Sequence, residues 1–491
     1  MTSGLRGAPV AVIGAGTMGG GIAQVAAVAG HPVTVYDSVE GAAGRAVASI
    51  RERVAGLVAK GRLEPAGLRL AVATGLGDLA GARCVIEAVA EDLAVKQALF
   101  AALEKVVDPG CVLATNTSSL SPTAIAAGLS RPGRLVGMHF FNPAPAMRLV
   151  EVVSGLATSP EAAAAVTRLA GDWGKQVVQA SATPGFIVNR VARPYYAEAL
   201  RLAEEQAAGP ATIDAVLTQA GGFRMGPFAL MDLVGQDVNE AVTRSVWTAF
   251  GYDPRFAPSL LQRALVEAGW LGRKTGRGWY DYGDGAAPPV PGAAPSRPAP
   301  AYVTEHGESP LRILLARAGV EVRPGAETDG SVRLPGGARL VRCDGTPAVA
   351  QAGPVVVVDR TLDDATASGI AIASSEGAVD EAVGLLQAAG LAVYVIGDVP
   401  GLVVTRTVAM LVNGAADARH TGVAGAADID TAMRLGTNYP LGPLAWGDRW
   451  GPGTVLQILG ALQAWYGEDR YRPSALLRRI AVTGGSLRGN S

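Results

Sequence analysis

The sequence predicts an α/β protein whose N-terminal part is a doubly wound, largely parallel sheet. Two all-helical modules follow, the second of them preceded by a reduced α/β segment. Short apolar runs alternate with helical patterns up to about residue 183, which is typical of parallel strands covered by helices on both faces. Beyond that point long helical patterns dominate, and one helical stretch occurs twice.

These changes of pattern divide the 491 residues into five expected parts, in line with about three domains that each have a sizeable core. A stretch rich in Gly, Ala and Pro reads as a linker of little regular structure. The parts are an α/β domain (1–183), a helical domain (184–282), the linker (283–301), a reduced α/β segment (302–399) and a second helical module (400–491).

The first predicted strand runs into a glycine-rich turn. Val10 to Ile13 is apolar, and Gly14-Ala15-Gly16-Thr17-Met18-Gly19 follows with G-x-G-x-x-G spacing. In a dinucleotide-binding turn the first glycine permits the bend, the second lets the backbone approach a pyrophosphate, and the third lets helix and strand pack closely. The helix that follows offers its free N–H groups to phosphate.

A second predicted strand, 32–36, supports this interpretation because it ends in Asp37. That acid follows Gly19 by 18 residues (37 − 19 = 18), close to the separation of about 20 expected for the carboxylate that binds the adenosine ribose. Together these features predict a Rossmann-like dinucleotide site. The alternative is a Gly-rich turn in an unrelated α/β fold, since the chain has 64 glycines.

The elements that follow continue the alternation of helix and strand, so ligand chemistry should gather at the carboxyl ends of the strands. Ser121 is expected to cap a short helix that has Pro122 at its first position. The expected elements are a helix over 41–61, a strand opening at 72, a strand over 84–89, a helix over 92–106 and strands over 111–115 and 135–140.

The repeat is visible as a constant separation. Pro184 to Arg190 recurs as Pro400 to Arg406 (400 − 184 = 216), and the same separation relates Asp232 to Asp448. A separation preserved over this span indicates that the helical module occurs twice. The second copy lacks a G-x-G-x-x-G turn, so we expect one dinucleotide site per chain.

Composition narrows the function classes. The net charge of −1 gives no field that would attract nucleic acid or an acidic membrane. Cys84, Cys111 and Cys343 lack metal-ligand spacing, so we expect no metal site and a reduced, cytoplasmic setting. Residues 9–30 carry no formal charge, but five glycines within 14–21 favour a buried strand and helix over a signal peptide or a membrane span.

Polar residues that suit hydride transfer follow the later strands. His139 can accept a hydroxyl proton, and Glu151, inside an apolar run, can orient an imidazole. Each has an alternative interpretation: His139 as a core histidine, Glu151 as a strand residue facing water, residues 116–119 as turn and cap chemistry, and Asn189 as a polar position on a helix.

Several motifs make the chain resemble the NAD-dependent 3-hydroxyacyl-CoA dehydrogenases from Val10 through Tyr282. The second helical module is similar to that family's C-terminal domain again. With this duplication the chain looks like the bacterial enzymes that act on 3-hydroxyadipyl-CoA in phenylacetate catabolism, or on 3-hydroxybutyryl-CoA. The motifs are the glycine turn, Glu87-Ala88-Val89-Ala90-Glu91-Asp92, Asn116-Thr117-Ser118-Ser119-Leu120, His139-Phe140-Phe141-Asn142-Pro143-Ala144-Pro145 and Pro184-Gly185-Phe186-Ile187-Val188-Asn189-Arg190.

The resemblance implies reversible oxidation of (S)-3-hydroxyacyl-CoA to 3-oxoacyl-CoA, a step of β-oxidation and fatty acid metabolism. It implies His139 as the general base with Glu151 as its partner. Ser118 and Asn189 would hold the C3 oxygen and the thioester end, and Asn142 would shape the same pocket. The implied cofactor is NAD, with contacts from Gly14, Gly16, Thr17, Met18, Gly19, Asp37, Glu91, Lys96 and Asn116.

Asp37 would favour NAD, because a 2′-phosphate would meet a like charge there. Lys60 is a plausible contact for the phosphates of the acyl-CoA substrate, with a solvated helix-end lysine as the alternative. A dicarboxylic substrate would need a cation near its far end, for which Arg148, Arg190 and Arg224 are candidates.

The second copy departs from the family pattern. Thr405 stands where the first copy has Asn189, and no counterpart of the His139–Glu151 pair is evident, so we expect no second site. The family's helical domain commonly supports dimerisation, so we expect a homodimer. Our hypothesis is that residues 400–480 pack on 184–282 and mimic that dimer contact within one chain.

Two other functions remain open. Dehydrogenases of the β-hydroxyacid or 6-phosphogluconate type share the plan but use a catalytic lysine on the helical domain, and no lysine lies between Lys175 and Lys274. A non-catalytic nucleotide-sensing protein would keep the fold, but the polar set around His139 argues against it.

Overall fold

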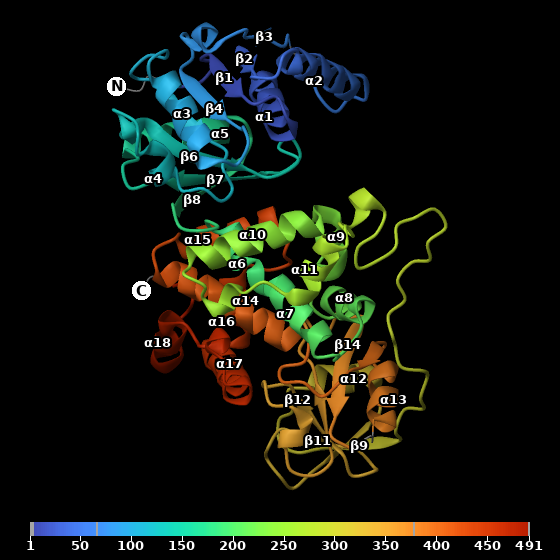
Figure 1. The fold of residues 1–491 in the computed structure, drawn as a ribbon. Coiled ribbons are helices and arrows are strands. Elements are labelled where there is room, and N and C mark those ends of the chain that lie inside the picture. The colour runs from blue at the N-terminus through green and yellow to red at the C-terminus, as the bar shows by residue number, and fades with distance from the viewer. Residues whose placement is uncertain (1–3, 65–66, 377–378, 490–491) are drawn as a thin grey trace. The chain divides into compact units, whose positions relative to one another are not determined.

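The computed structural model describes residues 4–64, 67–376 and 379–489. The chain divides into two compact units (Figure 1). The first comprises Met1–Arg190 together with Thr421–Thr437, and the second comprises Val191–His420 together with Asn438–Ser491. A short piece of the second helical module therefore belongs to the unit that holds the glycine turn.

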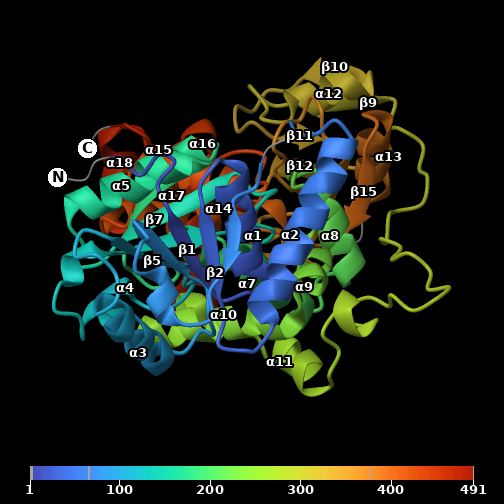
Figure 2. The same ribbon diagram turned by 90° about the horizontal axis from the view of Figure 1, so that it is seen from above.

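The first unit is built on an eight-stranded sheet with the order β3-β2-β1-β4-β5-β6-β7-β8. Neighbouring strands are parallel except β6 and β7, which are antiparallel. The strands are β1 Val10–Ile13, β2 Val33–Tyr36, β3 Leu70–Val72, β4 Cys84–Glu87, β5 Val112–Thr115, β6 Leu135–Phe140, β7 Leu149–Ser154 and β8 Gln176–Ser181. Figure 2 shows the adjacent strands β1 and β2 of the first unit.

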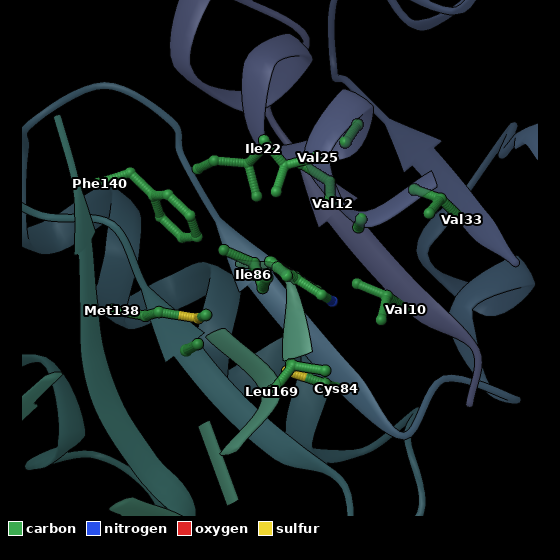
Figure 3. Packing of buried hydrophobic residues seen from close by; sticks show 14 of the residues in the cluster. Val10, Val12, Ile22, Val25, Val33, Cys84, Ile86, Met138, Phe140 and Leu169 are labelled. Atoms are coloured by element: carbon green, nitrogen blue, oxygen red, sulfur yellow. The ribbon is translucent and has the colours of Figure 1, made fainter. Parts of the chain in front are cut away.

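Helices cover both faces of this sheet, which confirms the doubly wound fold. Alternate residues of β1 belong to different cores, because successive side chains of a strand point to opposite faces. Val10 and Val12 pack with Ile22 of α1 (Figure 3), whereas Ile13 packs with Phe100 of α3. The helices are α1 Thr17–Val28, α2 Ala42–Ala59, α3 Leu93–Glu104, α4 Pro122–Ala126, α5 Pro160–Asp172, α6 Val188–Val191 and, from the second module, α15 Ala426–Gly436.

The strands and helices predicted for the first unit are confirmed, and one strand is displaced along the sequence. Residues 9–30 form a buried strand and helix, and the Ser121 hydroxyl accepts a hydrogen bond from the Ala124 N–H with Pro122 at the first helical position. The strand expected to open at Val72 instead ends there, as β3. The apolar pattern was misleading at this place, because β3 is an exposed edge strand whose limits follow its pairing with β2.

The second unit contains a seven-stranded sheet with the order β10-β9-β11-β12-β13-β14-β15. Its last four strands repeat the pattern of β5 to β8: two parallel strands, an antiparallel step and a parallel strand. Its helices are α12 Arg312–Ala318 and α13 Asp380–Ala388. The strands are β9 Tyr302–Glu305, β10 Glu321–Pro324, β11 Val332–Arg333, β12 Arg339–Arg342, β13 Val355–Val358, β14 Gly369–Ser374 and β15 Ala392–Val395.

This sheet lies in the segment 302–399 that was predicted as reduced α/β, and it has more strands than the sequence pattern there indicates. Its first strands are short and polar, and β10 is exposed along its whole length, so they carry little hydrophobic pattern. Residues 283–301, all of them described, contain neither helix nor strand, as expected of the linker. Over the described residues, no helix combines the length and apolar character needed to cross a bilayer.

The remaining helices of the second unit belong to both helical modules. Asp232 accepts hydrogen bonds from the N–H groups of Trp279 and Tyr280, and its counterpart Asp448 accepts one from the N–H group of Leu487. In both copies an aspartate therefore binds the backbone of the last segment. The helices are α7 Arg193–Glu204, α8 Pro210–Gln219, α9 Pro227–Val234, α10 Gln236–Ala249, α11 Leu260–Glu267, α14 Val404–His420, α16 Pro443–Trp450, α17 Pro452–Tyr466 and α18 Ala475–Thr483.

Candidate active site

The glycine turn has the geometry that the sequence predicted. Gly14 has a φ of +96°, and a Cβ atom there would lie 2.4 Å from the Ala88 carbonyl oxygen. A Cβ on Gly19 would lie 1.8 Å from the Gly14 oxygen, so helix α1 packs against the turn in a way that only glycine allows. Around Gly16 nothing lies within 4 Å of the Cβ position, so its backbone is open to a ligand.

Asp37, at the end of β2, is tied to this turn. Its Oδ2 accepts a hydrogen bond from the Ala15 N–H at 2.6 Å, and its Oδ1 accepts one from the Val39 N–H at 2.8 Å. Gly16, Thr17 and Asp37 all line one cavity of about 1280 Å³. A helix N-terminus, an open glycine backbone and a carboxylate therefore meet at one cavity, and this donor set fits a dinucleotide.

Lys60 lines the same cavity and is exposed at the end of α2. Met18 is half-buried and packs against the hydrophobic core behind the turn.

A buried ion pair joins the end of strand β4 to helix α3. The Lys96 ammonium lies 2.6 Å from Oε1 of Glu87 and 3.3 Å from Oε2 of Glu91, and only 1% of the lysine is exposed. The Thr115 hydroxyl donates to the other Glu87 oxygen at 2.6 Å. Glu87 was part of a sequence motif but had no predicted role. A carboxylate at the end of an apolar strand could have indicated a buried ion pair there. Lys96 contacts Glu91 from the protein interior.

Glu91 in turn holds the loop that carries Ser118. One oxygen of Glu91 accepts hydrogen bonds from the Thr117 hydroxyl and from the N–H groups of Ser118 and Ser119. Burial alone would raise the pKa of Glu91, but these hydrogen bonds and the Lys96 ammonium lower it to about 2. The carboxylate therefore stays ionised and fixes the Ser118 backbone.

His139 and Glu151 form a buried pair across the antiparallel strands β6 and β7, where they are directly opposite each other. Nδ1 of His139 lies 2.6 Å from Oε2 of Glu151, and the two residues are 6% and 0% exposed. The other Glu151 oxygen accepts hydrogen bonds from the N–H groups of Ile187 (3.1 Å) and Val188 (3.0 Å). Glu151 therefore faces the histidine and does not face water.

Two more predicted residues lie next to groups that are bonded to this pair or adjoin it in the chain. The Asn116 side-chain oxygen accepts a hydrogen bond from the Phe140 N–H at 2.8 Å, which fixes the end of β6 beside His139. Asn189 directly follows Val188, whose N–H is bonded to Glu151, and is half-buried in α6. The aromatic rings of Phe141 and Phe186 flank the His139 ring at 4.5 and 5.8 Å, contacts that no sequence pattern indicated.

Other predicted residues lie apart from these bonds. Asn142 is exposed in the loop after β6. Of the three arginines considered for a far carboxylate, Arg148 and Arg224 are exposed, whereas Arg190 is buried and donates a hydrogen bond to the Thr421 hydroxyl.

Among its described residues, the second copy has no such pair of histidine and carboxylate. Asp359 directly follows β13, the strand that corresponds to β6, and its N–H is bonded to the carbonyl of Ala371 on the antiparallel partner β14. Its carboxylate accepts hydrogen bonds from the N–H groups of Val403, Val404 and Thr405. Asp359 thus takes over only the helix-binding task of Glu151, and no histidine of the described residues is bonded to it.

A glycine turn with its acid, and a buried imidazole held by a carboxylate at the ends of the same sheet, define a dinucleotide-dependent dehydrogenase. Comparison with known proteins gives the family. Residues 9–183 match the 3-hydroxyacyl-CoA dehydrogenase NAD-binding domain, and 185–282 and 401–489 match its C-terminal domain. Residues 340–400 match the reduced Rossmann-fold domain of 3-hydroxybutyryl-CoA dehydrogenase.

The relatives agree with these matches. A 3-hydroxyadipyl-CoA dehydrogenase of Escherichia coli K12 is 47% identical over 96% of this chain and 97% of its own length. A crystal structure of 3-hydroxybutyryl-CoA dehydrogenase from E. coli K12 superposes with a TM-score of 0.89 at 46% identity, covering 97% of this chain and 98% of its own. The 3-hydroxybutyryl-CoA dehydrogenase of Mycobacterium tuberculosis is 43% identical but covers 56% of this chain and 98% of its own length.

The chain belongs to the 3-hydroxyacyl-CoA dehydrogenase family. It is an oxidoreductase that uses NAD and interconverts (S)-3-hydroxyacyl-CoA and 3-oxoacyl-CoA. The alternatives that the sequence left open, a β-hydroxyacid-type dehydrogenase and a nucleotide sensor, are set aside by this membership.

Proposed function

We propose that the chain oxidises (S)-3-hydroxyadipyl-CoA to the corresponding 3-oxoacyl-CoA, as a step of phenylacetate catabolism. The observation that carries this substrate is the similarity to the E. coli 3-hydroxyadipyl-CoA dehydrogenase along both copies. 3-Hydroxybutyryl-CoA is the second candidate, favoured by the name of the superposed crystal structure.

We assign the proton transfer to His139. Because Nδ1 faces Glu151, the carboxylate selects the tautomer in which Nδ1 carries the hydrogen and Nε2 is free to accept the C3 hydroxyl proton. The imidazolium that forms is stabilised by the same carboxylate. Bound NAD supplies the chemistry of accepting a hydride from C3.

The second oxygen of Glu151 accepts hydrogen bonds from two backbone N–H groups at the start of the helix that carries Asn189. Glu151 therefore cannot rotate away from His139 without losing these two hydrogen bonds. Asn189 and Ser118 would hold the C3 oxygen and the thioester end, and Asn142 would border the same pocket. Glu91 would position Ser118, and Asn116 would position His139 through the Phe140 N–H.

For the cofactor, Gly14, Gly16 and Gly19 would form the pyrophosphate turn, with Thr17 at the helix start. Asp37 would bind the adenosine ribose. Glu91, Lys96 and Asn116 would lie toward the nicotinamide end, and Lys60 would contact CoA phosphate.

The test is NADH formation at 340 nm with three kinds of substrate: 3-hydroxyadipyl-CoA, 3-hydroxybutyryl-CoA and the free 3-hydroxy acids. We expect kcat/KM to be highest for 3-hydroxyadipyl-CoA and negligible for the free acids. A clear preference for 3-hydroxybutyryl-CoA would transfer the assignment to the second candidate, and turnover of the free acids alone would contradict both.

We further infer a cytoplasmic enzyme, which the three buried free thiols favour. The five-part division of the chain at 183, 282, 301 and 399 stays part of this proposal, and the matched family segments support it.

A further inference from the structure

The loop that joins β6 to β7, residues 141–148, contributes to both parts of the candidate site. The ring of Phe141 packs on His139 with 4.5 Å between the ring centroids. Residues 143–145 line the cavity that also borders the glycine turn and Asp37. The position of this loop therefore sets one wall of the cofactor cavity.

The loop meets a glycine on helix α1. A Cβ atom on Gly21 would lie 3.2 Å from Cβ of Ala144 and 3.2 Å from Cδ of Pro145, so the loop rests closely on the helix. Ala144 is buried in the hydrophobic core of the first unit. Apolar packing of this kind is not directional, so by itself it does not fix where the loop lies along the helix.

A lysine just before β8 supplies directional contacts to the same loop. The Lys175 ammonium donates hydrogen bonds to the carbonyl oxygens of Ala144 at 2.6 Å and Met147 at 2.7 Å. The next residue, Gln176, donates its N–H to the Arg148 carbonyl at 2.8 Å. Both acceptors of the lysine are neutral, and burial lowers the pKa of Lys175. Since an ammonium buried among neutral groups costs free energy, the lysine is not the simplest residue for stability at this place.

The repeat shows that the fold does not require a lysine here. Lys175 follows Gly174, which has a φ of +73°, and Gly390 with a φ of +80° stands 216 positions later (390 − 174 = 216). The residue after it is Leu391, which is 4% exposed and packs in the hydrophobic core around the second sheet. The second copy also lacks a G-x-G-x-x-G turn. The lysine therefore accompanies the cofactor turn and not the entry into the strand.

We propose that Lys175 is a positioning residue of the cofactor site. By holding the carbonyls of Ala144 and Met147, it keeps residues 143–145 at the place on the cavity wall that bound NAD requires. Lys175 acts through the loop and is not itself a ligand of the cofactor. The proposal goes beyond the proposed function and does not depend on which acyl-CoA the enzyme oxidises.

The experiment compares the full-length enzyme with two variants of this residue. Lys175→Leu introduces the residue that the second copy has, and Lys175→Arg keeps a charged donor. The control is Lys105→Leu, which removes an exposed lysine at the end of α3, outside the cavity wall. Calorimetry measures the Kd for NAD without acyl-CoA, well below the melting temperature of each variant. Steady-state kinetics give KM for NAD and kcat.

We expect Lys175→Leu to raise the Kd for NAD by about tenfold, because a wall displaced by about 1 Å loses its contacts with the ligand. KM for NAD should rise with it, whereas kcat at saturating NAD should stay within about threefold, since Glu151 and Asn116 hold His139 and its strand without the loop. Lys175→Arg should keep the Kd within about threefold of the unaltered enzyme, because its donors can still reach carbonyls. The control should bind NAD as the unaltered enzyme does.

A lowered melting temperature with an unchanged Kd for NAD would make Lys175 a structural residue only and overturn the proposal. An equal rise of the Kd in the control would overturn it as well. If Lys175→Leu does not fold, Lys175→Gln takes its place: glutamine is too short to reach both carbonyls, so its Kd should exceed that of Lys175→Arg, and equal values would contradict the proposal. Binding of NAD is measured without a thioester, so the result stands whether or not the enzyme prefers 3-hydroxyadipyl-CoA.

Discussion

The carboxylate of Glu151 has two tasks, and the two copies of the chain separate them. In the first copy one oxygen faces His139 and the other receives the N–H groups of Ile187 and Val188. In the second copy Asp359 receives the N–H groups of the matching residues Val403 and Val404, and none of the hydrogen bonds found for it in the described part of the chain involves an imidazole. The helix contact is therefore structural in both copies, and only the contact with His139 serves the proton transfer that we propose.

We predict that His139→Ala lowers kcat by about 10²–10⁴-fold, the usual contribution of a positioned general base. Glu151 keeps its helix contact but its other, buried oxygen loses its partner, so the melting temperature should also fall. Steady-state kinetics and thermal melts of the same preparation measure both. A loss below tenfold in a folded variant would remove His139 from the proton transfer.

Asp37→Ala should mainly weaken NAD binding, because the carboxylate that would receive the ribose hydroxyls is lost. The Kd for NAD, measured by titration, should rise about tenfold or more, as expected for hydrogen bonds to a charged group. The KM for the acyl-CoA should change less. An unchanged Kd would exclude Asp37 from the cofactor site.

Glu91 gives a prediction about pH. Its pKa is lowered to about 2 in the fold, against an ordinary value of 4.5. A carboxyl group with a lowered pKa stabilises the fold above its ordinary pKa, and this stabilisation is lost as the pH falls from about 4.5 through about 2. The difference in melting temperature between the unaltered chain and Glu91→Gln should be constant from pH 8 to 6 and shrink below 4.5. A difference independent of pH would contradict the assignment.

Among the elements, those with a strong local pattern were predictable from sequence. The glycine turn and its acid, the alternation of strands and helices up to β6, and the repeat all follow from spacing or periodicity. The short polar strands β9 to β12 were not predictable, because pairing with neighbours defines them and their own pattern does not. The approach of His139 to Glu151 was an inference from chemistry, since only the antiparallel step between β6 and β7 places them opposite each other.

The unusual backbone conformation at residue 186 recurs at the matching position of the second copy, so it is not specific to the site around His139. Phe186 has a φ of +46°, unusual for a residue with a side chain, and it lies beside His139. Backbone strain next to a catalytic pair often serves function. Its counterpart Leu402 has a φ of +45° although the second copy lacks the pair. The conformation therefore belongs to the entry of the helix and not to catalysis.

The glycine turn allows a matched pair of substitutions. Gly19→Ala places a methyl group 1.8 Å from the Gly14 carbonyl oxygen, where backbone cannot yield, so we expect a destabilisation of about 3 kcal/mol. Gly16→Ala meets nothing within 4 Å and should melt normally, but its methyl group would stand where the pyrophosphate approaches. Thermal melts and NAD titrations separate the two effects. A Gly19→Ala variant as stable as the unaltered chain would contradict the packing role.

At the scale of the whole chain, the two copies exchange equivalent contacts. The Gly397 N–H donates to the Ala207 carbonyl within the second unit, and the Ser181 N–H donates to the Val423 carbonyl within the first, both at 2.8 Å. Residues 181 and 207 lie 216 positions before 397 and 423, so the two hydrogen bonds are related by the repeat. Reciprocal contacts of this kind are what a two-fold symmetric dimer makes between its subunits.

The second unit contains a further contact between the two helical modules. Helix α14 packs on α7, and Arg406 lies 3.1 Å from Glu198 with both side chains fully buried. The Tyr471 hydroxyl completes the cluster by donating to Glu198 at 3.0 Å. Removing one member of a buried ion pair costs about 3–5 kcal/mol, because the other charge remains buried. The first module therefore depends on a partner at this surface.

That dependence leads to a prediction for a fragment truncated after Tyr282. It lacks Arg406 and Tyr471, so Glu198 loses the partners described here, yet the counterpart of Arg406 in the first copy is Arg190, which a second fragment can bring to the matching position. The M. tuberculosis relative spans 56% of this chain, so a protein of about this extent exists. We expect the fragment to pair, doubling the number of chains per particle relative to the full-length enzyme. Light scattering coupled to gel filtration measures this number. An active fragment with an unchanged number of chains would show that the second module does not take the place of a dimer partner.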